Sequence, residues 1–231
     1  MTSRLLWFPA AGFVLLTLAV SRFDIWISAG AHTAALAHPA WRAVMDAVTL
    51  TGGTPMIGPL VAFGCLLLLM RGHWRQALFA ATAMVVTLTV RLGILGLVAR
   101  PRPVDRLAPA SNYSFPSGHS TASAAAALIL VIVCLPSLRH RWSRAALVIM
   151  AGLWALAVGV SRVALVVHWP TDVLGAWLLV LVVVPATGLL LDKLPGPRRA
   201  EEHDQDPDGV RDPDGDFERR RAGREVDGRR E

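Results

Sequence analysis

Residues 173–191 read VLGAWLLVLVVVPATGLLL, nineteen residues without a charged side chain. A helix needs about 20 mostly apolar residues to cross the hydrocarbon core of a bilayer. This stretch therefore predicts a transmembrane helix. Five earlier stretches have the same character, so we expect six transmembrane helices in all. Their expected ranges are 5–20, 55–70, 76–98, 121–135, 145–160 and 173–191.

The composition agrees with a membrane protein. Of the 231 residues, 54% are hydrophobic and 17% are charged, whereas soluble domains average about 45–50% and 25%. The 37 residues from Pro195 onward hold 21 of the 40 charged residues. Residues 1–194 are therefore expected to form one all-α integral membrane domain. Residues 195–231 contain too few apolar side chains to offset the entropy of ordering, and we expect a disordered cytoplasmic tail.

Three other classes of protein or site are disfavoured. The basic residues flank apolar stretches instead of forming one solvated face, which argues against a nucleic-acid partner. Cys65 and Cys134 both lie inside apolar stretches, where buried thiols are expected in place of a disulfide framework or a metal site. The single lysine, Lys193, lies after the last stretch, so no catalytic lysine is expected within the membrane.

The first stretch has a second interpretation. Arg4, a short apolar run and the small residues Ala19 and Ser21 also fit a secretory signal peptide. We favour a retained helix because the chain continues into further transmembrane stretches, and the orientation of those is the same either way. Residues 21–54 mix tryptophan with polar residues, which predicts short amphipathic helices at the membrane interface.

The distribution of basic residues predicts the orientation in the inner (plasma) membrane, because cytoplasmic loops carry an excess of Lys and Arg. One face has nine such residues: Arg4, Arg71, Arg75, Arg139, Arg141, Arg144, Lys193, Arg198 and Arg199. The other has six: Arg22, Arg42, Arg100, Arg102, Arg106 and Arg162. We therefore expect both termini in the cytoplasm.

Three polar segments interrupt the apolar pattern, and all three are expected on the outer face. They are RPRP at 100–103, SFPSGHS at 114–120 and SRVALVVHWPTD at 161–172. Arginine donates two parallel hydrogen bonds to a phosphate, and free amides at a helix start attract anions. Each segment alone could anchor a helix end at the interface. Their coincidence on one face favours a site for an anionic tetrahedral group.

These segments resemble the signatures of the type-2 phosphatidic acid phosphatase (PAP2) superfamily of membrane lipid phosphatases, which is related in its active site to the vanadium haloperoxidases. The family's second signature, Pro-Ser-Gly-His, is complete at 116–119. Its third, Ser-Arg-x5-His-x3-Asp, is complete at 161–172. Its first, Lys-x6-Arg-Pro, is present only as Arg102-Pro103. The resemblance covers about residues 76–191, which are expected to form the catalytic core from the last four helices.

The resemblance implies a role for each matching residue. His168 would be the nucleophile that forms a phosphohistidine, and Asp172 would accept its ring N–H. His119 would protonate the leaving oxygen and then activate water. The phosphoryl oxygens would be held by Arg102, Arg162, Ser117 and the Gly118 amide.

The lysine of the first signature falls on Leu95, which cannot contact phosphate. Arg91 lies one helical turn earlier, about 5.4 Å deeper along the axis, and its long side chain could reach outward. We expect Arg91 to supply the missing charge. Two alternatives are that Arg100 supplies it, or that Arg91 only pairs with Asp46 or a lipid phosphate.

The function implied is hydrolysis of a lipid phosphate or diphosphate at the outer membrane face. Polyprenyl diphosphate is the favoured substrate, followed by phosphatidylglycerophosphate and phosphatidate. Asp105 and Asp172 are the only acidic residues near the three segments, so we expect a reaction without a metal ion or other cofactor. The alternatives are a lipid phosphotransferase with the same intermediate, and a non-catalytic transporter or scaffold that binds phosphate lipids.

Overall fold

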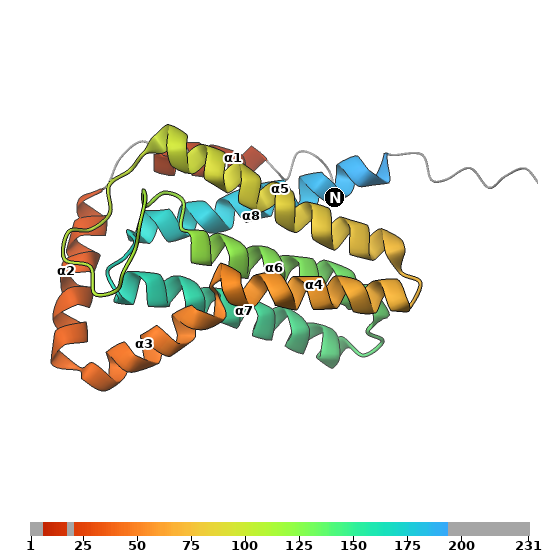
Figure 1. Cartoon of the computed structure of the whole chain (residues 1–231), viewed down its shortest axis with the longest axis horizontal. Helices are drawn as coiled ribbons and strands as arrows, with labels where there is room; N and C mark the ends of the chain where they lie inside the picture. Colours follow the sequence, from red (N-terminus) through yellow and green to blue (C-terminus); the bar gives the residue numbers. More distant parts are fainter. Residues whose placement is uncertain (1–6, 18–20, 194–231) are drawn as a thin grey trace, which may run out of the picture. The chain divides into compact units, whose positions relative to one another are not determined.

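The computed structural model describes residues 7–17 and 21–193, and these form eight α-helices and one 3-10 turn without a strand (Figure 1). The helices are α1 (Trp7–Thr17), α2 (Arg22–Ala37), α3 (Pro39–Thr51), α4 (Thr54–Met70), α5 (Trp74–Val98), α6 (Gly118–Cys134), α7 (Arg141–Ala164) and α8 (Pro170–Asp192), with the turn η2 (Leu135–Ser137) after α6. The predicted all-α class is confirmed.

Helix α6 lies at the centre of the bundle, where it contacts α4, α5, α7 and α8. Its buried positions include Ala122, Ala125 and Ala127. Small side chains let neighbouring helices approach closely, which is how helices associate when the surrounding lipid is as apolar as they are. The alanines of α6 therefore explain how one helix can hold four neighbours.

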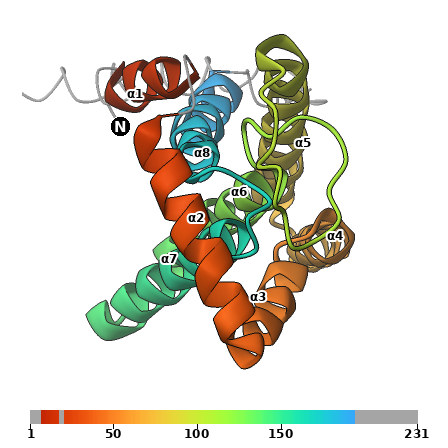
Figure 2. The ribbon, with the colours of Figure 1, turned by 90° about the vertical axis from the view of Figure 1, so that its left-hand side faces the viewer.

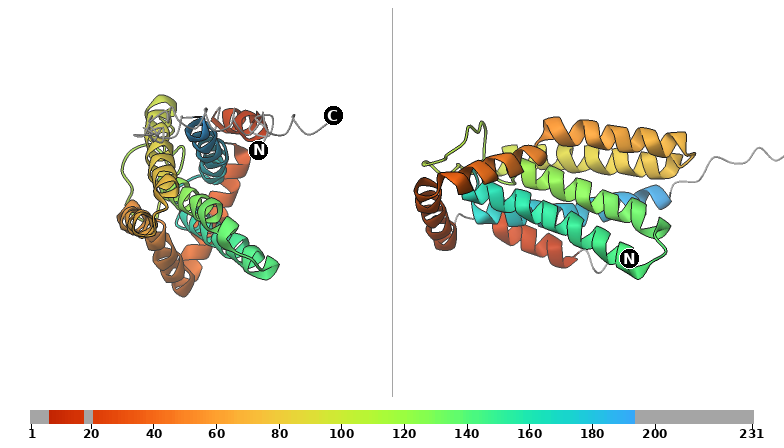
Figure 3. Two further views of the ribbon diagram at one scale, coloured as in Figure 1. Left: turned by 90° about the vertical axis from the view of Figure 1, so that its right-hand side faces the viewer. Right: turned by 90° about the horizontal axis from the view of Figure 1, so that it is seen from below.

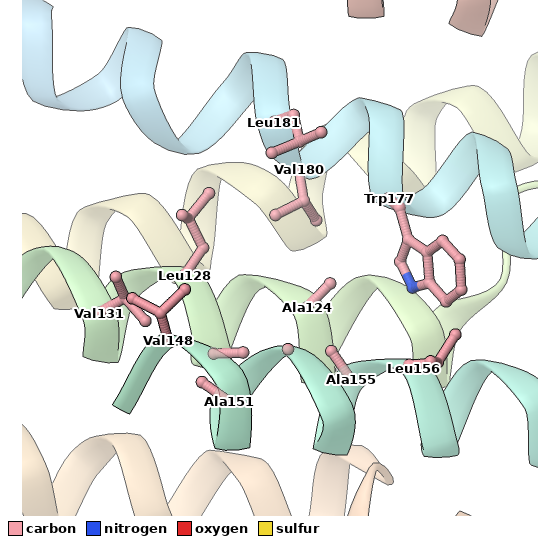
Figure 4. A pocket seen from close by; sticks show the side chains of 12 residues that line it. Ala124, Leu128, Val131, Val148, Ala151, Ala155, Leu156, Trp177, Val180 and Leu181 are labelled. Carbon is pink, nitrogen blue, oxygen red and sulfur yellow. The ribbon is translucent and has the colours of Figure 1, made fainter. Parts of the chain in front are cut away.

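An apolar cavity of about 310 Å³ lies between α6, α7 and α8 (Figure 4). Ala124 of α6 and Ala151 and Ala155 of α7 line it, because their short side chains do not fill the space between the helices. Trp177 of α8 closes one end (Figure 4). No charged side chain lines this cavity, so it does not have the chemistry of a phosphate site.

Four of the helices, α5 to α8, are long and apolar enough to cross a membrane. Helices α3 and α4 form a fifth span if the pair, bent by 40°, counts as one. The predicted number of six is therefore not confirmed. In the first predicted stretch the structure describes only the 11 residues of α1, and the predicted tail at 195–231 lies outside the described residues.

Helices α3 and α4 meet at a bend (Figure 3). The bend falls at Gly52 and Gly53, and a close contact leaves no room for a side chain at Gly52. A Cβ atom on Gly52 would lie 2.3 Å from Cγ1 of Val158 in α7. A Cβ atom on Gly53 would lie 3.4 Å from Nε2 of His119. Gly52 thus allows the end of α3 to pack closely against α7, which leads into one of the polar segments, whereas the distance at Gly53 is that of an ordinary contact.

We expect Gly52→Ala to lower the stability of the protein by about 1–3 kcal/mol, because Val158 is fully buried and has a stiff, branched side chain that cannot yield. The measurement is thermal unfolding in detergent. Gly64→Ala on α4 is the control, since a Cβ there meets nothing within 4 Å. Equal Tm values for both variants would contradict the prediction.

Candidate active site

The polar segments meet at one end of the bundle, where the loop after α5 and the loop between α7 and α8 lie over the start of α6 (Figure 2). A cavity of about 720 Å³ opens there. Six of the eight residues predicted for the site line it: Arg91, Arg102, Gly118, His119, Arg162 and His168. The structure therefore brings together residues from all three segments and from α5.

The loop between α7 and α8 places Arg162 and His168 on the same cavity. The backbone N–H groups of Val167 and His168 both donate to the carbonyl of Arg162, at 3.2 and 3.3 Å. Val166 adopts a φ of 56°, a left-handed conformation that is rare for a β-branched residue. This tight, buried turn fixes His168 at the start of α8.

His168 contacts a different group with each ring nitrogen. Its Nδ1 lies 3.3 Å from Oδ2 of Asp172, and its Nε2 lies 2.9 Å from Nη1 of Arg102. Because a guanidinium can only donate, Nε2 must be the unprotonated nitrogen, and Nδ1 then carries the proton that Asp172 accepts.

The protonation state of His168 agrees with this arrangement. Burial lowers its pKa from 6.5 to about 4, although the hydrogen bond and charge of Asp172 act in the opposite direction. The imidazole is therefore neutral at neutral pH. A neutral imidazole with a lone pair on the cavity side is the form that can attack phosphorus.

Arg102 is held by backbone carbonyls. Its Nε donates to Asn112 O at 2.9 Å, Nη2 to Ser111 O at 3.1 Å, and Nη1 to Val167 O at 2.8 Å. Burial lowers the pKa of Arg102, but a guanidinium remains charged in proteins. Carbonyls fix the group in place without neutralising its charge, which stays directed at His168.

Two further cations approach the cavity from different helices. Arg162 is 5% exposed, its Nη1 donates to Thr49 Oγ1 at 2.6 Å, and its buried Nε has no hydrogen-bond partner. Arg91 donates from Nε to Pro116 O at 3.1 Å. A Cβ on Gly118 would lie 3.2 Å from Cζ of Arg91, so the glycine lets this guanidinium rest against the start of α6.

Arg100 has a different environment from Arg102. Its Nη1 lies 2.9 Å from Asp172 Oδ1 and 2.9 Å from Thr171 Oγ1, and its guanidinium stacks 4.4 Å from the ring centroid of Phe115. It does not line the cavity. Of the two candidates for the missing lysine, Arg91 is thus the one on the cavity wall. Asp46, the alternative partner considered for Arg91, lies 3.9 Å from Arg42.

Two predicted residues lie behind the cavity wall. Asp172 is fully buried, with its Oδ2 3.3 Å from Nδ1 of His168, and its role in orienting His168 stays a prediction. Ser117 is also fully buried, and its hydroxyl accepts hydrogen bonds from the backbone N–H and the hydroxyl of Ser120. In this arrangement Ser117 caps α6, and direct contact with phosphate stays a prediction.

The sequence analysis missed three groups that the structure adds to the site. Thr54 and Arg106 line the cavity, and Thr49 holds Arg162. The two threonines belong to helices outside the three polar segments, and no local pattern marks them. Among the described residues, no group of three or more His, Cys, Asp or Glu side chains could hold a metal ion.

Comparison with known proteins identifies the family, because residues 76–193 match the PAP2 superfamily. The chain belongs to this superfamily. It is 31% identical over 179 residues to phosphatidylglycerophosphatase B of Bacillus subtilis, and the aligned residues cover 76% of this chain and 86% of that protein. It is 37% identical over 79 residues to an undecaprenyl-diphosphatase of Sulfolobus acidocaldarius, and the aligned residues cover 34% of this chain and 31% of that protein.

A solved structure agrees. The crystal structure of a transmembrane PAP2-type phosphatidylglycerolphosphate phosphatase from Bacillus subtilis superposes with a TM-score of 0.67 and 28% identity. The match covers 82% of this chain and 98% of the other. This PAP2 protein is accordingly a multi-pass membrane phosphatase that acts on lipid phosphates, as the sequence signatures predicted.

We expect Arg91→Leu to lower turnover of a lipid phosphate at least tenfold, equivalent to about 1.4 kcal/mol or more of transition-state stabilisation. The reason is that the substitution removes a cation from the cavity wall. Phosphate release by purified protein is the measurement. Arg75→Leu is the control, because Arg75 lies at the opposite end of α5, against Trp74. Near-normal turnover of Arg91→Leu would show that this cavity works with one cation fewer.

Proposed function

We propose that this PAP2 phosphatase removes the terminal phosphate of a membrane lipid through a phosphohistidine formed on His168. One observation carries the proposal. The neutral imidazole of His168 directs an unprotonated Nε2 at a cavity lined by arginines, while Asp172 holds the other ring nitrogen.

In the first step, Nε2 of His168 attacks phosphorus, so that an N–P bond forms and the P–O bond to the lipid breaks. His119 donates a proton to the leaving oxygen. As charge builds on the phosphoryl oxygens, Arg102, Arg162 and Arg91 stabilise it. Arg102 moves its Nη1 hydrogen bond from Nε2 to a phosphoryl oxygen, which frees the nucleophile. The amide of Gly118 at the start of α6 contributes a further donor.

In the second step, His119 is neutral and takes a proton from water, whose oxygen attacks phosphorus. The N–P bond breaks, inorganic phosphate is released, and His119 regains its proton. Asp172 stabilises the N–H of His168 throughout both steps. Transfer of the phosphoryl group to a second lipid would use the same intermediate, with a lipid hydroxyl in place of water.

The substrate is proposed to carry a second phosphate beyond the one that is removed. The cavity wall includes four guanidinium groups, with Arg106 in addition to the three above, which exceeds what one phosphoryl group needs. Phosphatidylglycerophosphate and polyprenyl diphosphate both meet this condition, and phosphatidate does not. The relative that aligns with most of this chain is a phosphatidylglycerophosphatase, so phosphatidylglycerophosphate is the first substrate to test and polyprenyl diphosphate the second.

The reaction is proposed to take place at the outer face of the inner membrane. The excess of basic residues at the opposite end of the helices supports this orientation. We expect a reporter that is active only outside the cytoplasm to remain inactive when fused after Glu231. An active fusion would reverse the orientation.

The intermediate gives a direct test of the mechanism. After rapid mixing with substrate labelled in its terminal phosphate, and an alkaline quench, we expect label on wild-type protein and none on His168→Ala, which should also lose turnover. EDTA should change neither result. Asp172→Asn is expected to be severely slowed, because a neutral amide has one acceptor oxygen in place of the two that contact Arg100 and His168. Substantial turnover by His168→Ala would refute the assignment of the nucleophile.

A further inference from the structure

Asp24 lies in α2, outside the part of the chain that matches the PAP2 superfamily. It is fully buried. Its carboxylate nevertheless accepts hydrogen bonds from two separate helices. Within α2, Oδ2 accepts from the backbone N–H and the hydroxyl of Ser21, at 2.9 and 3.1 Å. Across the bundle, Oδ1 accepts from the backbone N–H of Thr171 and Oδ2 from its hydroxyl, both at 2.9 Å.

Thr171 passes this contact on towards the catalytic pair. Its hydroxyl donates to Asp24 and accepts from Nη1 of Arg100 at 2.9 Å. The same Nη1 lies 2.9 Å from Oδ1 of Asp172. A hydrogen-bonded chain therefore runs from Asp24 through Thr171, Arg100 and Asp172 to His168. Every side chain in it is at most 7% exposed.

The chain leaves Asp172 little freedom. Its Oδ1 accepts from Arg100, and its Oδ2 accepts from the backbone N–H of Trp169 at 2.9 Å and faces His168 Nδ1. The hydroxyl of Thr171 has one proton, which it donates in the hydrogen bond to Asp24. This sets the direction of the hydroxyl lone pairs, which receive Arg100. If Asp24 no longer accepted, the hydroxyl could turn, and the lone pair that receives Nη1 of Arg100 would no longer be held in place.

We propose that Asp24 is a positioning residue for the nucleophile, acting through Thr171 and Arg100 to hold Asp172 and hence His168 at its attack orientation. The inference rests on the proposed role of His168. It assigns to α2 a part in the reaction besides packing. Misplacing a reacting group by about 1 Å can cost about a hundredfold in rate, so a small rotation of Asp172 is enough to matter.

The test compares the steady-state kinetics of purified variants with phosphatidylglycerophosphate and with polyprenyl diphosphate as substrates. Each variant is assayed well below its own Tm. We expect Asp24→Asn to lower kcat by about tenfold to a hundredfold and to change KM less than twofold, because Asp24 does not line the cavity. Ser28→Ala is the matched control on α2, since the Ser28 hydroxyl is buried without a hydrogen-bond partner. It should keep the kcat of wild type.

Thr171 provides a second pair of variants, which also serves if Asp24→Asn fails to fold. Thr171→Val removes the hydroxyl at nearly constant volume and should lower kcat as Asp24→Asn does. Thr171→Ser keeps the hydroxyl and should retain most of the turnover. Because both changes break one chain, the double variant Asp24→Asn/Thr171→Val should be little slower than either single variant.

Several results would overturn the proposal. A lower Tm with unchanged kcat would show that Asp24 only stabilises the packing of α2 against α8. A raised KM at constant kcat would indicate substrate binding, and an inactive Thr171→Ser would show that the methyl group matters in place of the hydroxyl. If His168→Ala is inactive and unlabelled while Asp24→Asn has normal kcat, only this inference fails. If His168→Ala keeps turnover, the proposed function itself fails.

Discussion

The buried carboxylate of Asp172 is the group on which the arrangement of this end of the protein depends. It is fully buried, and a carboxylate without partners at such a position would be strongly destabilising. Its partners come from separate segments: Arg100 after α5, and His168 and Trp169 before α8. Satisfying one carboxylate thus brings the loop after α5 against the start of α8. The backbone carbonyl of Asp172 also accepts from Ser117 N at 3.1 Å, which ties in the start of α6.

The arginines behind the cavity and on its wall have different hydrogen-bond partners. Arg100, behind the cavity, is paired with Asp172. Arg91, Arg102 and Arg162, on the cavity wall, donate to neutral acceptors, which are backbone carbonyls, the hydroxyl of Thr49 and Nε2 of His168. Neutral acceptors satisfy N–H groups and fix their directions but cancel no charge. The positive potential is therefore available to a phosphoryl group, whose developing negative charge takes the place of a counterion.

The sequence predicts those parts of the fold and of the site that depend on residues close together in the chain. The stretches at 76–98 and 173–191 are contiguous patterns, and the structure has helices α5 and α8 there. The signature residues His119, His168 and Asp172 also belong to contiguous patterns, and their roles stay proposals. Arg91 could be anticipated because one helical turn relates it to Leu95. The role of Arg102 is predicted from its signature, but the pairing of Arg100 with Asp172 could not be predicted, because an irregular loop has no periodicity that relates the two residues. The predicted number of six spans is not confirmed: four helices are long and apolar enough to cross a membrane, and α3 with α4 makes a fifth only if the bent pair counts as one span.

Two of the residues that no motif marks contact the site from outside residues 76–193. Arg162 is held by Thr49 of α3, and Thr171 by Asp24 of α2. Both contacts join residues more than a hundred positions apart, so only the packing of α2 and α3 against α7 and α8 creates them. Each satisfies a buried polar group that the catalytic segment cannot satisfy by itself: without Thr49, a second nitrogen of Arg162 would join the Nε that already has no partner. Helices α5 to α8 and their loops carry the residues proposed to react, and helices α2 and α3 supply hydrogen-bond acceptors to groups beside them.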